Sequence, residues 1–411
     1  MTNKELVKQA EKSLAEQFEI IDEIRDFNQE KVLNAFIENK VAPEHFYTVS
    51  GYGHDDLGRE VLDRVFADVF KAEKALVRVH FASGTHTLAC ALFGNLKYGD
   101  KLVSVAGTPY DTMQEVIGVM GDDETKRSSL IGNGVLYDEV PLLNGSDIDF
   151  EALEQKIDET VTMVLIQRSK GYSTRKSLTI DTIERICKVV KSKNPNCICF
   201  VDNCYGEFVD IKEPLEVGAD LMAGSLIKNA GGGIVEAGGY IAGKELYVER
   251  SAVRLTAPGI GSEGGAMFNQ HRLMFQGLFM APSVVSDALK GAVLASKIFD
   301  EIGYNSYPKY YEKRTDIIQN ITFGAPEPLE EFCRTVQSLS PVNGYVTPIP
   351  ENIPGYEDKV IMAGGTFIEG STIELSADGP MREPYVAYLQ GGLNYAHVKI
   401  ALKKFLDKVR T

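Results

Sequence analysis

The stretch ADLMAGSLIKNAGGGIVEAGGYIAG, residues 219–243, places a lysine between an apolar run and a cluster of glycines. The run DLMAGSLI predicts a buried strand, Lys228 follows it, and Ser225 lies three residues earlier. Burial should lower the pKa of this amine, so that it can attack a carbonyl group and form a Schiff base. The ordinary alternative is a lysine whose stem covers apolar surface while its head stays in water. Glycines 231–233 favour the first interpretation, because they would let a ligand approach the backbone closely.

Strand-like and helical runs alternate on both sides of this stretch, from about residue 60 to 245. The expected strands are KALVRVHFAS, KLVSVA, TMVLIQ, CICFVD and DLMAGSLI, and helices are expected at THTLACALFGNL and IDTIERICKVVKS. Such alternation predicts an α/β fold, with a mainly parallel sheet covered by helices on both faces.

The flanking segments have a different pattern. Residues 1–50 are expected to form an amphipathic helix over 3–38 and then a loop, and residues 51–282 the large domain. Residues 283–411 are expected to form a smaller α+β domain. Its helices are predicted near 283–304 and 392–409, and its strands at FCRTVQ, DKVIMAGGTFI and TIEL.

Composition excludes several classes of protein. The formal net charge is −15 and the basic residues are dispersed, so nucleic acid and anionic membranes are not expected as partners. A charged N-terminal segment and the lack of a continuous apolar run of about 18 residues argue against a secretion signal or a membrane span, and we expect a cytoplasmic protein. The six cysteines are expected to be reduced and buried. Cys197 and Cys199 could share one face of a strand, but no second ligand pair accompanies them, so no metal is expected.

Polar groups follow two further predicted strands. Ser83, Gly84 and Thr85 lead from a strand into a helix, and Asp202 ends the strand CICFVD. In parallel sheets such strand ends converge on a ligand site. The Ser-Gly-Thr turn could be a simple helix cap, or it could cradle a phosphate with its backbone N–H groups. Asp202 could likewise cap the next segment, or balance a buried cation.

Taken together, these groups are what pyridoxal phosphate requires. Lys228 would hold its aldehyde, Asp202 would pair with its ring nitrogen, and the Ser-Gly-Thr turn with Ser225 would bind its phosphate. Neither GxxxxGK[ST] nor a GxGxxG fingerprint of the dinucleotide type is present.

Five motifs connect this interpretation with a known family of enzymes: SGYGHDDLGRE, HFASGTHTL, GTPYDT, VDNCYGEF and GSLIKNAGGG. With them the chain resembles the fold-type I pyridoxal-phosphate enzymes of the cystathionine and methionine γ-lyase group. It is most similar to the bacterial aluminium-resistance, or methionine-γ-lyase-like, branch. The resemblance covers most of the chain, and it implies a mainly parallel, seven-stranded sheet between helices.

The resemblance also implies roles for further residues. Tyr110 would stack on the pyridine ring, and Tyr52 would extend to the cofactor phosphate of a neighbouring subunit, which makes a homodimer or homotetramer the expected assembly. Arg382 would grip the substrate α-carboxylate. Gln167 and Arg168, at the end of a strand, would approach the cofactor's phenolic oxygen or the substrate.

The resulting hypothesis is a carbon–sulfur lyase acting on an amino acid of the methionine, cystathionine or cysteine type through a Lys228 Schiff base. Leu226 and Ile227 stand where the better-known γ-lyases often carry a hydroxyl residue just before the lysine, which leaves the substrate open. The alternatives are a γ-replacement synthase, an aminotransferase, or a catalytically weak, cofactor-binding protein of stress tolerance.

Overall fold

A computed structural model describes residues 2–353 and 358–410. Its helices are α1 (Asn3–Ser13), α2 (Ala15–Glu38), α3 (Leu57–Phe70), α4 (Gly84–Asn95), α5 (Asp111–Ile117), α6 (Asp123–Ser128), α7 (Phe150–Lys156), α8 (Ile180–Lys193), α9 (Glu245–Leu255), α10 (His271–Glu301), α11 (Pro326–Ser338) and α12 (Tyr395–Val409). Its strands are β1 (Lys74–Arg78), β2 (Lys101–Ser104), β3 (Leu136–Glu139), β4 (Leu142–Leu143), β5 (Asp147–Ile148), β6 (Val161–Gln167), β7 (Ile198–Asp202), β8 (Leu221–Ser225), β9 (Gly239–Gly243), β10 (Asn305–Tyr307), β11 (Ile318–Thr322), β12 (Val360–Ala363), β13 (Ser376–Pro380) and β14 (Val386–Gln390).

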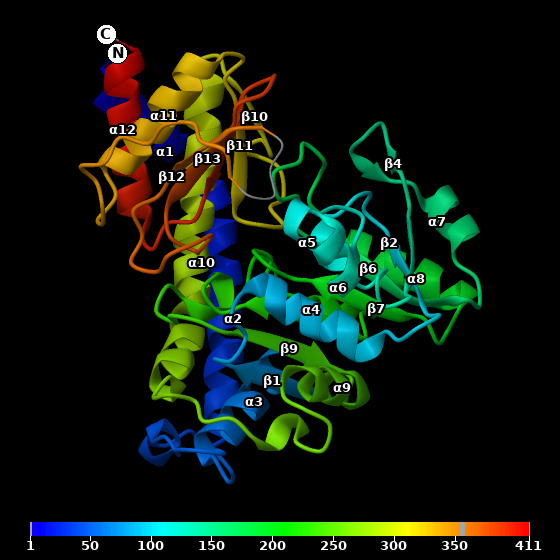
Figure 1. Ribbon diagram of the computed structural model, residues 1–411. Coiled ribbons are helices and arrows are strands. Elements are labelled where there is room, and N and C mark those ends of the chain that lie inside the picture. Colours follow the sequence, from blue (N-terminus) through cyan, green and yellow to red (C-terminus); the bar gives the residue numbers. More distant parts are fainter. Residues whose placement is uncertain (1, 354–357, 411) are drawn as a thin grey trace.

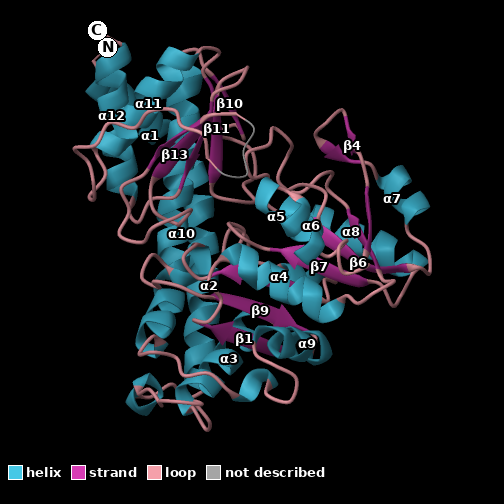
Figure 2. Cartoon of the chain, viewed as in Figure 1, coloured by secondary structure: helices cyan, strands magenta, loops and turns pink. Residues whose placement is uncertain are grey.

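The larger sheet has seven strands in the order β1-β9-β8-β7-β6-β2-β3. Neighbouring strands from β8 to β3 pair in parallel, whereas β9 runs antiparallel to both β1 and β8. Helices cover both faces of this sheet (Figure 2). The predicted α/β class and the mainly parallel sheet are therefore confirmed.

Alternate residues of β1, β2 and β6 to β9 pack into two separate apolar cores. In β6, Met163 and Leu165 join the core shared with α4 and α9, whereas Val164 and Ile166 join the core shared with α3, α8 and α10. This follows from the two-residue repeat of a strand, which sends successive side chains to opposite faces. Because both faces are covered, the inner strands are mainly apolar, whereas the edge strand β3 contains Asp138 and Glu139.

The smaller sheet is antiparallel, in the order β10-β11-β14-β13-β12, with α10 packed on β11 and α11 packed on β12 and β13. Two expectations fail here. FCRTVQ, predicted as a strand, forms the last part of helix α11, and TIEL precedes strand β13 without belonging to it. The buried Leu329, Phe332, Cys333 and Val336 recur at helical spacing, so the helical period outweighs the local content of strand-forming residues.

Helix α10 belongs to both parts of the molecule. It runs alongside α2 and continues into the C-terminal part, so the expected boundary at residue 283 falls inside one unbroken helix that contains Pro282 (Figure 1). Helix α1 packs against α10 and α12, which brings the two termini together. Helix α10 is long and apolar enough to cross a membrane, but 72% of its apolar window is buried inside the protein, as in a core helix.

Candidate functional site

A cavity of about 430 Å³ lies at the carboxyl ends of β6, β7 and β8. The small sheet contributes to its wall through Ile318, Tyr388 and Gln390. The structure brings eight of the predicted site residues to this cavity: Ser83, Gly84, Thr85, Tyr110, Gln167, Asp202, Ser225 and Lys228.

The alternation of strand residues explains how three of them meet. Gln167 pairs in register with Asp202 across β6 and β7, and Ser225 ends the neighbouring strand β8. All three continue the strand positions that face α4, the helix that begins beside them. Because parallel strands end at the same edge, one face of that edge carries an amide, a carboxylate and a hydroxyl.

Arg168 lies on the opposite face of the sheet. Its side chain is fully buried, and its Nη1 atom donates to Asn203 Oδ1 at 2.8 Å and lies 3.5 Å from Glu213 Oε2. Arg168 does not line the cavity. Arg168 was expected to approach the cofactor's phenolic oxygen or the substrate, and the structure places it elsewhere. It follows Gln167, the last residue of β6, and successive residues of an extended chain point to opposite faces.

Lys228 is surrounded by groups that can carry negative charge. Its Nζ atom lies 4.1 Å from the centroid of the Tyr205 ring. Burial lowers the pKa of Lys228, but Cys204, Tyr205 and Asp202 together outweigh burial, so the pKa lies above its ordinary value. The expected lowering of this pKa is therefore wrong. The amine is protonated at neutral pH and shares the cavity with a carboxylate.

Asp202 is almost completely buried, and its Oδ1 atom accepts from the backbone N–H of Cys204 at 3.1 Å. Burial raises the pKa of this carboxyl, while Lys228 and the Cys204 N–H oppose the rise. A buried carboxylate of this kind needs a cationic or proton-donating partner within the cavity. A protonated ring nitrogen is such a partner.

The start of α4 forms one corner of the cavity. The Ser83 hydroxyl caps the helix by accepting from the His86 N–H at 3.1 Å. The first N–H groups of a helix lack partners within the helix. Across from them the Ser225 hydroxyl is buried without a hydrogen-bond partner in the described residues. A Cβ atom on Gly84 would lie 3.2 Å from the Cβ of Ser225, so glycine keeps this space open. The free N–H groups, the orphaned hydroxyl and the open space fit a phosphate group.

Tyr110 is held in place by Gln167. The backbone N–H of Tyr110 donates to Gln167 Oε1 at 3.2 Å, and Gln167 Nε2 donates to the carbonyl oxygen of Ser169 at 2.8 Å. Burial is the first cause that raises the pKa of the Tyr110 phenol, followed by the charge of Asp202. Tyr110 is thus a neutral aromatic side chain at the cavity wall.

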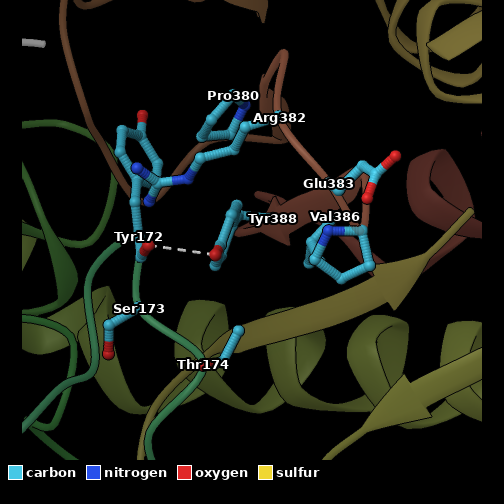
Figure 3. A pocket seen from close by; sticks show the side chains of 9 residues that line it. Tyr172, Ser173, Thr174, Pro380, Arg382, Glu383, Val386 and Tyr388 are labelled. Atoms are coloured by element: carbon cyan, nitrogen blue, oxygen red, sulfur yellow. Dashed lines mark hydrogen bonds between the residues drawn. The ribbon is translucent and has the colours of Figure 1, made fainter. Parts of the chain in front are cut away.

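Arg382 lies outside this cavity. It lines two smaller cavities that adjoin it, and its Nη1 atom lies 3.2 Å from Asp358 Oδ2 with 55% of the side chain exposed. In Figure 3 the Arg382 side chain extends toward Tyr172, whose carbonyl oxygen accepts from the Tyr388 hydroxyl at 3.0 Å. The assignment of Arg382 to the substrate carboxylate stays a prediction.

Tyr52 does not reach the cavity of its own chain. It lies on a loop with 82% of its surface exposed. Arg59 fixes this loop by donating to the carbonyl oxygens of Gly53 at 2.6 Å and Gly265 at 3.2 Å. The position leaves the Tyr52 ring available to a neighbouring subunit.

The glycines after Lys228 have another role than the one expected. They do not line the cavity. A Cβ atom on Gly231 would lie 1.6 Å from the carbonyl oxygen of Leu226, and one on Gly232 would lie 2.3 Å from that of Gly277 in α10. These glycines therefore let the lysine loop fold tightly against helix α10, and they do not make room for a ligand.

The cavity residues that had no predicted role include Cys204, Tyr205, Tyr388 and Gln390. Tyr205 has a positive φ of 67°, which is uncommon for a residue with a side chain. The sequence VDNCYGEF offered one signal, because residues just after the carboxyl end of β7 must lie at the same edge as Asp202. No local signal marks Tyr388 and Gln390, which come from a distant strand.

The fold and this edge of the sheet define a class of protein. The fold is that of the fold-type I pyridoxal-phosphate enzymes, and a solved structure of this fold is the pyridoxal-5'-phosphate dependent protein YhfS from Escherichia coli, with a TM-score of 0.62. That match covers 95% of this chain and 97% of the other at 16% identity, so it shows that the folds are similar and nothing about function.

The chain belongs to the methionine gamma-lyase family, whose model matches residues 3–410. It is 47% identical to the uncharacterized protein YnbB of Bacillus subtilis over 100% of this chain and 98% of the other. It also resembles a carbon-sulfur lyase involved in aluminum resistance from Clostridium novyi, at 49% identity and a TM-score of 0.94, over 99% and 96% of the two chains. A candidate cystathionine beta-lyase involved in aluminum resistance from Listeria monocytogenes matches at 48% identity and a TM-score of 0.96, over 99% and 100%. The predicted resemblance to this branch is confirmed.

Proposed function

We propose that this protein is a pyridoxal-phosphate-dependent carbon–sulfur lyase that acts on a sulfur-containing amino acid. The observation that carries the proposal is the meeting of Lys228, Asp202, Ser225 and the start of α4 around one cavity of about 430 Å³. Family membership and the names of the relatives from Clostridium novyi and Listeria monocytogenes support carbon–sulfur bond cleavage.

Bound in this cavity, pyridoxal phosphate would supply an aldehyde for the lysine amine and a ring that takes up the negative charge left when the substrate loses its α-proton. Ser83, Gly84, Thr85 and Ser225 would hold its phosphate. Asp202 would keep a proton at the ring nitrogen, since a buried carboxylate favours a cationic partner. Tyr110 would cover one face of the ring, in the place that Gln167 fixes.

Lys228 has two tasks in this proposal. It would anchor the cofactor, and its amine, when not linked to the cofactor, would be the base that removes the α-proton of the substrate. The Tyr205 ring, 4.1 Å from Nζ, is a platform that favours the charged form of the amine once it holds this proton. The same ammonium can then return the proton to the reacting carbon chain.

The test is spectroscopic and chemical. Purified protein with added cofactor should show a visible absorbance band that borohydride abolishes, and methionine, cystathionine or cysteine should release thiol, ammonia and keto acid. Lys228→Ala should lose the band and nearly all turnover, whereas Lys176→Ala, at an exposed position, should keep both. A protein without the band, or a Lys228→Ala variant with normal turnover, would contradict the proposal. Keto acid without thiol would favour the aminotransferase.

We further propose that the active unit is a homodimer with shared sites. The exposure of Tyr52 outside its own cavity supports this arrangement. Tyr52→Ala and Lys228→Ala subunits, each inactive alone, should regain activity when mixed, because one hybrid site would then be intact. A monomer with full activity would refute shared sites.

A further inference from the structure

A second cavity, of about 350 Å³, adjoins the cofactor cavity. Tyr110, Gln167 and Tyr172 line both, so the two cavities meet at these side chains. A substrate bound at Lys228 could extend from one into the other. The chemistry of the second cavity therefore bears on which substrates fit.

Two buried cations line this second cavity. Lys170 is 2% exposed and Arg175 is 4% exposed. Lys170 Nζ donates to the carbonyl oxygen of Tyr307 at 3.3 Å, and it lies 5.0 Å from the centroid of the Tyr307 ring. Arg175 Nη2 donates to the carbonyl oxygens of Gln167 at 2.9 Å and Ser169 at 2.7 Å. Neither cation has a carboxylate within ion-pair distance in the described part of the chain.

Two acidic groups near these cations, Asp316 and Asp358, already have partners. Asp316 attracts both cations from a distance, but its Oδ2 atom accepts from the hydroxyl groups of Ser169 at 2.8 Å and Ser177 at 2.5 Å. Asp358, which also lines the second cavity, is paired with Arg382 at 3.2 Å. Burial lowers the pKa of Lys170 to about 8 and that of Arg175 to about 10, which is the cost of holding charge here. Buried cations of this kind are normally paired, and an anionic ligand would pair them.

We propose that the second cavity binds a carboxylate carried on the sulfur-linked chain of the substrate, and that Lys170 and Arg175 select for it. The inference rests on the proposed lyase function and names its substrate class: amino acids whose leaving thiol bears its own carboxylate. A simple thioether such as methionine offers these cations nothing to bind. Arg175 also braces the loop through backbone carbonyl groups, so Lys170 is the cleaner residue to test.

The experiment uses two substrates that differ in one group. S-(3-carboxypropyl)-L-cysteine and S-(4-hydroxybutyl)-L-cysteine have chains of equal length that end in a carboxylate or an alcohol, and the homocysteine counterparts cover elimination at the γ position. The holoenzyme should show a higher kcat/KM for the carboxylate. Lys170→Met should reduce this preference about tenfold or more, the loss expected for a hydrogen bond between charged groups. Lys176→Met, on the same loop but exposed and paired with Asp147, is the matched control and should keep the preference.

Three further results decide the matter. Lys170→Arg should retain most of the preference, because it keeps the charge. Lys170→Gln, which can still donate to the Tyr307 carbonyl, gives the same readout if the methionine variant does not fold. If Lys170→Met kept the preference for the carboxylate substrate, or if the wild type showed no such preference, the proposed role of the second cavity would be wrong, while the proposed lyase function would stand. A protein that releases no thiol from any substrate and shows no borohydride-sensitive band would overturn the proposed function as well.

Discussion

The ammonium of Lys228 lies 4.1 Å from the ring centroid of Tyr205. The Tyr205 hydroxyl donates to the carbonyl oxygen of Ser371 at 3.3 Å and lies 3.4 Å from Gln390 Nε2. The side chain therefore joins the amine to the C-terminal part of the protein. Its ring and its hydroxyl have different partners, so they can be tested separately.

Tyr205→Phe keeps the ring over Lys228 and loses the two hydrogen bonds. We expect a loss of about 1 kcal/mol per hydrogen bond in the free energy of unfolding, and turnover within a few-fold of wild type. Tyr205→Ala also removes the ring, and turnover should fall at least about tenfold, by the loss of a buried cation–π contact. Denaturation in urea and steady-state kinetics measure both effects. Equal kinetics for the two variants would show that the ring has no role at the amine.

Arg168 provides a contrast between stability and catalysis. Because it is buried against Asn203 and Glu213 on the far side of the sheet, Arg168→Met leaves the Glu213 carboxylate without its cation. We expect the free energy of unfolding to fall by about 3–5 kcal/mol, while KM of the folded enzyme stays unchanged. A raised KM with normal stability would restore Arg168 as a substrate ligand.

The Asp378 carboxyl gives a prediction for the pH dependence of stability. Burial raises its pKa to about 6, and the hydroxyl of Tyr172, which donates to Asp378 Oδ2 at 2.5 Å, partly opposes the rise. Since the folded protein holds this proton more tightly than the unfolded chain, the group costs stability as pH rises from about 4 through 6, by about 3 kcal/mol in all.

Asp378→Asn removes that titration. The difference in the free energy of unfolding between the variant and the wild type should therefore favour the variant more at pH 8 than at pH 4. Urea unfolding at both pH values measures this difference. The comparison of two pH values separates the titration from any constant packing cost of the new amide group. A difference between variant and wild type that is the same at both pH values would contradict the assignment.

Substitution by alanine should affect cofactor binding at Gly84 and the stability of the fold at Gly231. At Gly84 a Cβ atom would approach the Ser225 side chain at 3.2 Å, so Gly84→Ala should weaken cofactor binding about tenfold with little change in the stability of the ligand-free protein. At Gly231 the same atom would collide with the carbonyl oxygen of Leu226, so Gly231→Ala should destabilise the fold itself by about 3 kcal/mol or more. Cofactor titration and thermal unfolding separate the two. Equal effects of both changes on cofactor binding would refute the distinction.

The sequence predicts most of the large sheet because its strands are short apolar runs separated by helices. It does not predict β9, because the sequence GYIAG is rich in glycine, which is uncommon in strands. The neighbour that requires a glycine here is visible only in the folded structure: a Cβ atom on Gly239 would lie 2.1 Å from Thr87 Oγ1. Six of the eight predicted residues at the cavity follow from the convergence of strand ends, whereas Tyr110 and Gln167 were predicted from the resemblance to the family. The placement of Arg168 was also open to prediction, by counting two residues at a time along β6. Contacts from the small sheet, such as Gln390 with Tyr205, depend on tertiary packing that no local pattern encodes.

The unbroken helix α10 bears on how this protein could be divided or engineered. Cutting the chain near residue 282 would leave each fragment with part of a helix and an uncovered apolar stripe. The first fragment would also lose Ile373, whose backbone N–H donates to the carbonyl oxygen of Ile227, next to Lys228, at 3.2 Å. Removing α1 would likewise uncover α12 at the other end. The two sheets are thus not interchangeable modules. A chimera with a C-terminal part from another protein would require a junction outside residues 271–301. The reactivity of the Lys228 amine would have to be measured again in each chimera.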